Sequence, residues 1–275
     1  MNQKKIDSLE TLYEKLLVML DATKSKKETF GIITHNNPDG DGLAACLGLK
    51  RLFASMNITL DIILQGESLD KLSFLDVENN TKNLSEKMQY DNLIVIDCHG
   101  YDRIGDAKLL VPKAKRVLII DHHIITELIP GADYYIAEEV ASVGIIIYNL
   151  LKKELMNSDP ETQNYYARAI YTTIINDTNN FLNTNVDKEV FRVSADLLDF
   201  GLVPAEVTLK LLYEKAPREF KMIGQSLSTI KLFHDNKTLL FLTTREFLDS
   251  NDLDDSATSK MTQWVKGVKG VEVVL

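Results

Sequence analysis

Residues 117–123 read Val-Leu-Ile-Ile-Asp-His-His, an apolar run that ends in one acid and two histidines. Residues 93–99 repeat the pattern, with Leu-Ile-Val-Ile followed by Asp-Cys-His. Short, fully apolar runs are typical of strands inside a parallel sheet that is covered on both faces. We therefore predict two buried strands, each with polar side chains directly after its last apolar residue.

Strand and helix patterns alternate on either side of these two runs. This alternation predicts an α/β fold with a doubly wound, mainly parallel sheet. An amphipathic helix is predicted within the first 27 residues, where apolar side chains recur every three or four positions. The further strands are predicted at 30–34 and 58–64, and the further helices at about 43–53, 143–156, 161–175 and 188–200.

The pattern changes after Gly201 and Pro204. Two apolar strands, 229–233 and 238–242, are predicted to form a hairpin around residues 234–237. A helix at about 256–265 and a strand at 271–275 would complete a smaller α+β domain. We predict a first domain over 1–200, a helical linker over 201–220 and the second domain over 221–275.

Composition and charge exclude several classes of protein. The 275 residues are 45% hydrophobic and 26% charged, which is typical of a globular protein. The net charge of −9 argues against a protein that binds long duplex DNA. No apolar run is long enough for a membrane span, and Cys46 and Cys98 are too few for a disulfide framework, so we predict a cytoplasmic protein.

Polar side chains gather after three of the predicted strands. The chain has five histidines, and four of them directly follow such a strand. Ligands of open α/β sheets bind beyond the carboxyl ends of the strands. Each motif alone has an ordinary explanation as a turn, a helix cap or a surface pair, but the combination is far more specific. The residues are His35, Asp39 and Asp41, then Asp97 and His99, then Asp121, His122 and His123, and finally Asp177 and Thr178 after a helical stretch.

These residue types favour a particular kind of metal site. Carboxylates and imidazoles without paired thiolates suit Mn²⁺, Mg²⁺ or Co²⁺ better than structural Zn²⁺. So many carboxylates at one place would repel one another strongly unless divalent cations lay among them. Two such ions would activate a bridging water and bind a phosphoryl oxygen. An acidic protein that handles phosphate needs positive charge of this local kind.

The same residues resemble the four ordered motifs of the DHH phosphoesterases. The resemblance covers the first domain, and the second domain is similar to the start of the associated DHHA1 domain. Within the family, the likeness is to short bacterial proteins that degrade nano-RNA and dephosphorylate 3′-phosphoadenosine 5′-phosphate (pAp). The motifs are His35-Asn-Asn-Pro-Asp39-Gly-Asp41, Asp97 with Arg103 six residues later, Asp121-His122-His123, and Asp177-Thr178.

The resemblance implies a role for each of these positions. His35 and Asp39 would hold one metal ion, and Asp41, His122 and Asp177 a second, with Asp97 bridging both. His123 would face the substrate phosphate and stabilise charge in the transition state. Asp121 would orient its neighbours. Arg103 would contact phosphate, with a surface ion pair to Asp106 as the alternative.

The implied function is a metal-dependent phosphohydrolase that uses two Mn²⁺ ions, or Mg²⁺ or Co²⁺, to activate a hydroxide. Its substrates would be pAp and very short oligonucleotides. The alternatives are an exopolyphosphatase, a phosphodiesterase for cyclic or linear dinucleotides, and a non-catalytic nucleotide-binding sensor. No membrane partner is expected, and a second copy of the chain is a candidate partner.

One segment that is typical of the family is missing. Relatives carry a Gly-rich segment that ends in histidine near the C-terminus, whereas this sequence stops at Leu275 without it. Either the protein is naturally short or the sequence is cut from a longer chain. The resemblance implies that this segment helps to hold the substrate, so we expect this chain to hold substrates weakly.

Overall fold

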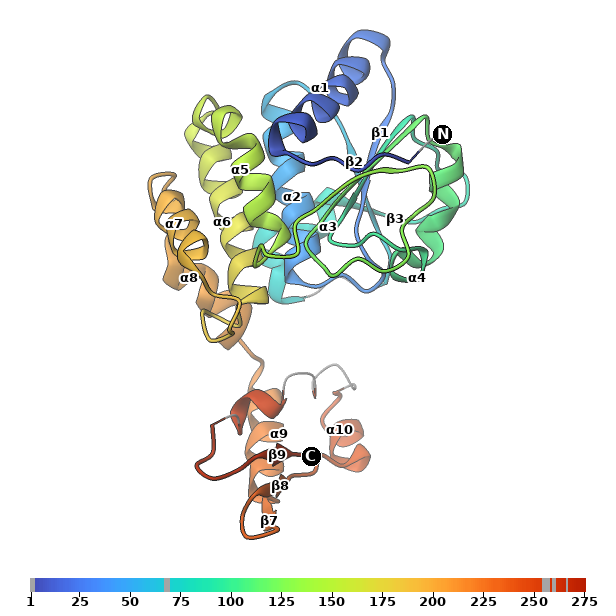
Figure 1. Cartoon of the computed structure of the whole chain (residues 1–275). Coiled ribbons are helices and arrows are strands. Elements are labelled where there is room, and N and C mark those ends of the chain that lie inside the picture. The colour runs from blue at the N-terminus through green and yellow to red at the C-terminus, as the bar shows by residue number, and fades with distance from the viewer. Residues whose placement is uncertain (1–2, 67–69, 254–257, 259–260, 266) are drawn as a thin grey trace. The chain divides into compact units, whose positions relative to one another are not determined.

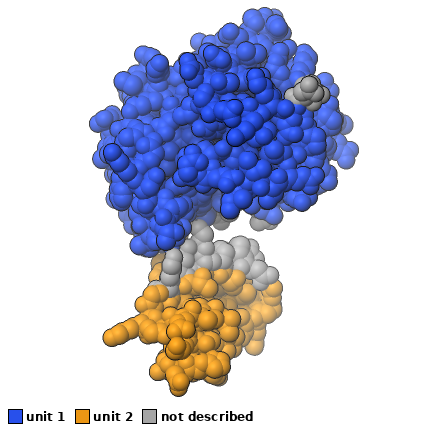
Figure 2. Space-filling model, viewed as in Figure 1, with its two compact units in different colours: residues 1–213 blue, residues 214–275 orange. Residues whose placement is uncertain are grey.

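A computed structural model gives the fold of the chain and describes residues 3–66, 70–253, 258, 261–265 and 267–275. Figure 1 shows the ribbon, and Figure 2 colours two compact units, residues 1–213 and 214–275. The predicted linker 201–220 is therefore divided between the units. Its first part belongs to unit 1 because Val207 and Leu211 are buried in the core of that unit.

Unit 1 contains a sheet of six strands, all parallel, in the order β3-β2-β1-β4-β5-β6. The predicted doubly wound α/β fold is confirmed. The chain builds outward from β1 in one direction and from β4 in the other, so the strand order reverses between these two strands. The strands are β1 Phe30–Ile33, β2 Asp61–Leu64, β3 Thr81–Asn83, β4 Asn92–Ile96, β5 Arg116–Asp121 and β6 Asp133–Ile136.

Helices cover both faces of this sheet (Figure 1). Side chains alternate along a strand, so Ile94 and Ile96 of β4 pack into the larger core with α2, α5 and α6, whereas Leu93 and Val95 pack against η2. The helices are α1 Leu9–Lys26, α2 Gly40–Ser55, η1 Asp70–Leu75, α3 Val77–Asn80, α4 Tyr101–Ile104, η2 Gly105–Lys113, α5 Val143–Met156, α6 Pro160–Asp177, α7 Lys188–Leu198, α8 Pro204–Thr208 and η3 Leu209–Tyr213.

Unit 2 is a small α+β unit. The predicted hairpin is confirmed, because β7 and β8 are antiparallel and His234, Asp235 and Asn236 at the turn adopt positive φ angles. β9 pairs with β8 in parallel. The predicted helix at 256–265 lies partly outside the described residues. The elements are α9 Pro217–Ser228, β7 Lys231–Phe233, β8 Thr238–Leu240, α10 Arg245–Ser250, η5 Met261–Trp264 and β9 Val273–Val274.

In the part of the chain that the structure describes, no helix combines the length and the apolar character needed to span a membrane.

Candidate metal centre

The predicted site residues meet at the carboxyl edge of the parallel sheet. The first motif follows β1, Asp97 follows β4, and His122 and His123 follow β5. β1 and β4 are the neighbours between which the strand order reverses, which is where doubly wound folds bind their ligands. Asp177, the last residue of α6, reaches the same place.

One group of potential metal ligands consists of His35, Asp39 and Asp97. The Nε2 atom of His35 lies 3.7 Å from Oδ1 of Asp39 and 3.7 Å from Oδ2 of Asp97. Nδ1 of the same ring lies 3.0 Å from the carbonyl oxygen of Asn36, which only accepts hydrogen bonds. In the neutral ring, Nδ1 therefore donates and Nε2 keeps its lone pair toward the carboxylates.

A second group consists of Asp41, His122 and Asp177. Nε2 of His122 lies 3.2 Å from Oδ2 of Asp41 and 3.3 Å from Oδ2 of Asp177. Nδ1 of His122 lies 3.0 Å from the carbonyl oxygen of Val140, which fixes the ring as Asn36 fixes His35. Asp41 is anchored as well, because its Oδ2 accepts from the backbone N–H of Val143 at 2.9 Å.

Asp97 lies between the two groups. Its Oδ1 is 3.3 Å from Nε2 of His122, while its Oδ2 is turned to His35. The residue adopts a φ of 63°, a left-handed conformation that is costly for aspartate and is often found at functional sites. Gly42 makes room for it, since a Cβ at that position would lie 2.2 Å from Oγ1 of Thr34 and 3.0 Å from Oδ2 of Asp97.

The start of α2 brings the first motif into position. Asp39 caps this helix, and its Oδ1 accepts from the backbone N–H groups of Asp41 (2.9 Å) and Gly42 (3.4 Å). The cap places the helix start at Gly40, three residues before the predicted start at Leu43. Asp41 therefore lies in the first turn, where the helix dipole favours a negative charge.

The atoms of both groups fit a divalent cation. Four buried side-chain atoms that face this place have no hydrogen-bond partner within the described residues: Nε2 of His35, Oδ1 of Asp41, Oδ1 of Asp97 and Nε2 of His122. Buried polar atoms are rarely left unsatisfied, and an ion is one reason why they are. Neighbouring ligands of an octahedral ion with bonds of about 2.1 Å lie about 3 Å apart, close to the separations around His122.

The pKa values of the site residues also favour a bound cation. Burial raises the pKa of Asp97 to about 6, and the nearby carboxylates of Asp39 and Asp177 add to this rise. Burial, then Asp177 and Asp97, also raise the pKa of Asp41 well above its usual value. Burial alone would lower the pKa of His122, but its three carboxylate partners outweigh it and raise the pKa far above the usual range. A divalent cation would relieve this repulsion and replace the proton.

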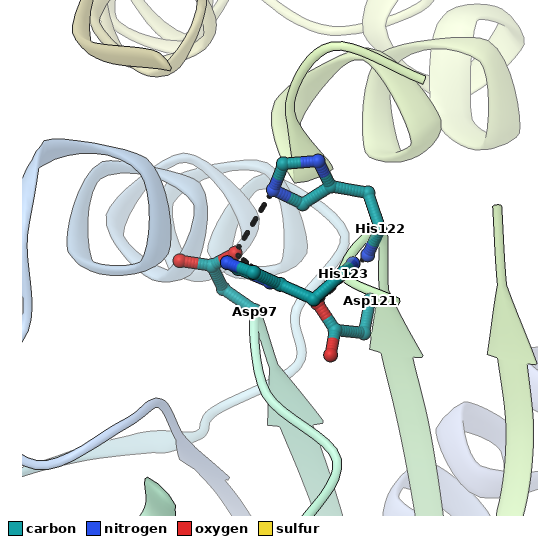
Figure 3. Close-up of side chains that lie close together, drawn as sticks. All are labelled: Asp97, Asp121, His122 and His123. Carbon is teal, nitrogen blue, oxygen red and sulfur yellow. Dashed lines mark hydrogen bonds and ion pairs between the residues drawn. The ribbon is translucent and has the colours of Figure 1, made fainter. Parts of the chain in front are cut away.

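His123 differs from His122 in its surroundings (Figure 3). Its side chain is 39% exposed, against 11% for His122. Nδ1 of His123 donates to Oδ1 of Asp121 at 2.8 Å. Neighbouring residues of a strand point in opposite directions, but β5 ends at Asp121, before the two histidines, and their ring centroids lie only 4.6 Å apart. Both rings also lie near Asp97 and Asp121, which makes this foursome another potential group of ligands.

Arg103 is not among the grouped ligand residues. It lies in α4, its side chain is exposed, and its backbone carbonyl accepts from the N–H of Asn36 at 2.7 Å. Across the described residues, no ion pair joins Arg103 to Asp106. Sequence reasoning missed Asn176, whose amide donates to Oδ1 of Asp177 at 2.9 Å. Its position directly before a motif aspartate was the available signal.

Comparison with known proteins gives the class of the chain. The model of the DHH family, N-terminal domain, matches residues 29–174, more than half of the sequence. The chain belongs to the DHH family. This match confirms the resemblance to DHH phosphoesterases that the four motifs predict.

Two curated relatives share a name. The chain is 28% identical over 223 residues to the bifunctional oligoribonuclease and PAP phosphatase NrnA of Thermus thermophilus, over 81% of this chain and 65% of that protein. It is 24% identical over 260 residues to the Bacillus subtilis protein of the same name, over 90% of this chain and 77% of that protein. The chain thus spans slightly less than two-thirds of the Thermus protein.

Two solved structures support the fold. An exopolyphosphatase-related protein from Bacteroides fragilis matches with a TM-score of 0.82 at 18% identity, over 95% of this chain and 78% of that one. A putative family II inorganic pyrophosphatase from Methanococcus jannaschii matches with a TM-score of 0.51 at 17% identity, over 88% of this chain and 80% of that one. At these identities the likeness concerns the fold alone.

Proposed function

We propose that the chain is a metal-dependent phosphohydrolase that removes phosphate from pAp and degrades very short oligonucleotides. One observation carries the proposal. Asp97 belongs to one trio of potential ligands, its Oδ1 lies 3.3 Å from Nε2 of His122 in the other trio, and buried ligand atoms in both trios lack a hydrogen-bond partner among the described residues. Oxygen and imidazole ligands without thiolates favour Mn²⁺, with Mg²⁺ and Co²⁺ as alternatives.

Each site residue has a role in this proposal. His35 and Asp39 hold one ion, Asp41, His122 and Asp177 hold the other, and Asp97 binds both. When bound, two divalent cations supply Lewis acidity and lower the pKa of a water molecule. The chain supplies the fixed geometry, since carbonyl oxygens hold the rings of His35 and His122 with Nε2 toward the carboxylates.

The residues around the ions bind the phosphate. His123 is more exposed than the ligands and is held by Asp121 through Nδ1, so its Nε2 is the atom that we assign to the substrate phosphate. A donor at that position stabilises the charge that develops on phosphorus oxygens. Arg103 is assigned a phosphate contact as well, which suits its exposed guanidinium.

The substrate class rests on the relatives and on charge. The names of the Thermus and Bacillus relatives state oligoribonuclease and PAP phosphatase activities. The net charge of −9 disfavours long polyanions and leaves the metal site as the local source of positive charge. Two buried, unpaired thiols, Cys46 and Cys98, fit a reducing compartment, so we place the protein in the cytoplasm.

The test is phosphate and nucleotide release from a substrate panel with Mn²⁺, with Mg²⁺ and after chelation. The panel holds pAp, oligonucleotides of two to five residues, cyclic dinucleotides and polyphosphate. We expect release from pAp and the shortest oligonucleotides, and none after chelation. If the protein turned over only polyphosphate or only cyclic dinucleotides, that compound would replace pAp and short oligonucleotides as the proposed substrate. Tight binding of pAp without turnover would favour the non-catalytic sensor.

A further inference from the structure

His99 has no part in the three groups of potential metal ligands, although it is buried two residues after Asp97. Its two ring nitrogens have different partners. Nε2 accepts from the backbone N–H of Thr126 at 3.1 Å and lies 3.2 Å from Oγ1 of the same residue, and Nδ1 faces Oδ2 of Asp121. Because a backbone N–H only donates, Nε2 carries the lone pair and Nδ1 the proton. Nδ1 of His99 thus donates to the carboxylate of Asp121.

Asp121 is fully buried and accepts on both oxygens. Its Oδ1 accepts from the backbone N–H of His122 (2.7 Å), the backbone N–H of His123 (3.2 Å) and Nδ1 of His123. In the described chain, the ring of His99 is the hydrogen-bond partner of Oδ2. A buried carboxylate oxygen without a partner is costly. His99 therefore holds the carboxylate in the orientation that presents Oδ1 to His123.

His99 also holds the segment that follows the two histidines. Its carbonyl oxygen accepts from the N–H of Ile129 at 2.8 Å, in addition to the bond from Thr126 to its ring. A Cβ at the next residue, Gly100, would lie 2.8 Å from the carbonyl oxygen of Glu127. The backbone at Glu127 therefore packs closely against the backbone at Gly100. The ring of His99 thus makes two separable contacts, one to the segment through Nε2 and one to Asp121 through Nδ1.

We propose that His99 is a positioning residue that acts on His123 through Asp121. The expected effect of His99 on kcat rests on the proposed function, in which His123 contacts the substrate phosphate. A ring that is fixed in angle and tautomer offers Nε2 to the phosphate in one geometry, whereas a carboxylate that rotates would let the ring move with it. Loss of such a supporting hydrogen bond typically costs about 10–100-fold in activity.

Two near-isosteric variants separate the two contacts of the ring. His99→Asn places its amide donor where Nδ1 lies and keeps the bond to Asp121. His99→Gln places its amide near the position of Nε2 and keeps a partner for Thr126. We expect His99→Gln to lower kcat for pAp by roughly 10–100-fold with an unchanged metal content, and His99→Asn to stay within about threefold. Equal losses in both variants, or a larger loss in His99→Asn, would overturn the proposal. Thr126→Val removes the hydroxyl contact of Nε2 but keeps the backbone N–H and the Asp121 bond, so it should stay within about threefold of wild type, like His99→Asn.

A double-mutant cycle tests whether His99 acts through His123. In a His123→Ala background, His99→Gln should lower kcat by less than about twofold, because the ring that it positions is gone. A merely structural role would give the same loss in both backgrounds, and that result would contradict the proposal.

The third readout does not need turnover, so it separates failure of this proposal from failure of the proposed function. Nitrogen-15 spectra of histidine-labelled protein with Mg²⁺ should show a ring with the proton on Nδ1 that is missing in His99→Asn. The signals of His123, assigned with His123→Ala, should shift in His99→Gln and stay in place in His99→Asn. Unchanged His123 signals in both variants would overturn the proposal, whichever substrate the protein turns over.

Discussion

The central strands of unit 1 and the first hairpin strand of unit 2 differ in burial. In residues 1–213, β1 and β4 are buried along their whole length, whereas in residues 214–275 every residue of β7 is exposed. The buried strands are followed by polar residues whose positions are fixed, because the core and the neighbouring strands hold the backbone. The exposed strand ends in a hairpin turn, where side chains face solvent.

The histidines show what this difference means for chemistry. Four of the five lie at the ends of the buried strands in unit 1, and their rings are held by carbonyl oxygens, carboxylates or a backbone N–H. His234 lies in the hairpin of unit 2, is exposed and contacts Oγ1 of Thr238. A metal site needs ligands that are held in place before the ion binds. Unit 1 meets this condition, so we assign the chemistry to it.

The largest effect is expected from Asp97→Ala. This change removes a ligand from both proposed ions and lets their charges face each other, so we expect kcat/KM for pAp to fall on the order of 1,000-fold and the bound metal to fall below two ions per chain. His234→Ala is the matched control in unit 2 and should stay within about twofold of wild type. Near-normal turnover with two bound ions in Asp97→Ala would remove the bridging role.

A smaller loss is expected from His123→Ala. Loss of one donor to the transition state typically slows turnover by about 100-fold or more, while the metal content should stay at two because His123 belongs to neither proposed ligand trio. His122→Ala should instead lose metal. Elemental analysis of both purified variants, together with kcat, decides the matter, and a loss of metal in His123→Ala would exchange the two roles.

Stability should separate the units as well. Leu239 in β8 is 1% exposed, and its truncation to alanine should lower the free energy of unfolding of unit 2 by about 3 kcal/mol. Metal stoichiometry, which depends on unit 1, should not change. Urea unfolding and metal titration of the same variant check this. Ile94→Ala in β4 is the matched control variant in unit 1. Metal loss in Leu239→Ala would show that the site depends on unit 2.

The smallest predicted effect is the pH dependence of metal affinity. The pKa of Asp97 in the metal-free protein is about 6, because burial disfavours its charged form. The ion displaces the proton of His122, whose pKa is raised, over the whole range, and below pH 6 it must also displace a proton from Asp97, so the fall in affinity should steepen by about tenfold per pH unit there. Calorimetric titration with Mn²⁺ at pH 5 and pH 8 tests this. His234→Ala should keep the same slope, and an affinity that is flat over this range would contradict the assignment.

Much of unit 1 could be predicted from the sequence, for a physical reason. A strand buried on both faces must be apolar throughout, and the runs that end at Ile33, Ile96 and Ile120 show this directly. The two outer strands were missed. β3 reads Thr-Lys-Asn and β6 Asp-Tyr-Tyr-Ile, which are partly exposed sequences without an apolar run.

The sequence predicted which polar residues gather at this edge of the sheet, and it predicted less of how they contact one another. The proposed metal ligands are polar residues directly after apolar strands, and the four motifs make this pattern recognisable in the sequence. The left-handed backbone of Asp97 and the bond between His99 and Asp121 left no local pattern. The second of these joins residues 22 positions apart, and only the pairing of β4 with β5 brings them together.

Anomalous diffraction from crystals grown with Mn²⁺ is the decisive test of the two-metal site, because it locates the ions without reference to any substrate. We predict two manganese peaks in unit 1, one between His35, Asp39 and Asp97 and the other between Asp41, His122 and Asp177, with Asp97 in contact with both. A single peak, or a peak bound by Asp121 and His123, would contradict it.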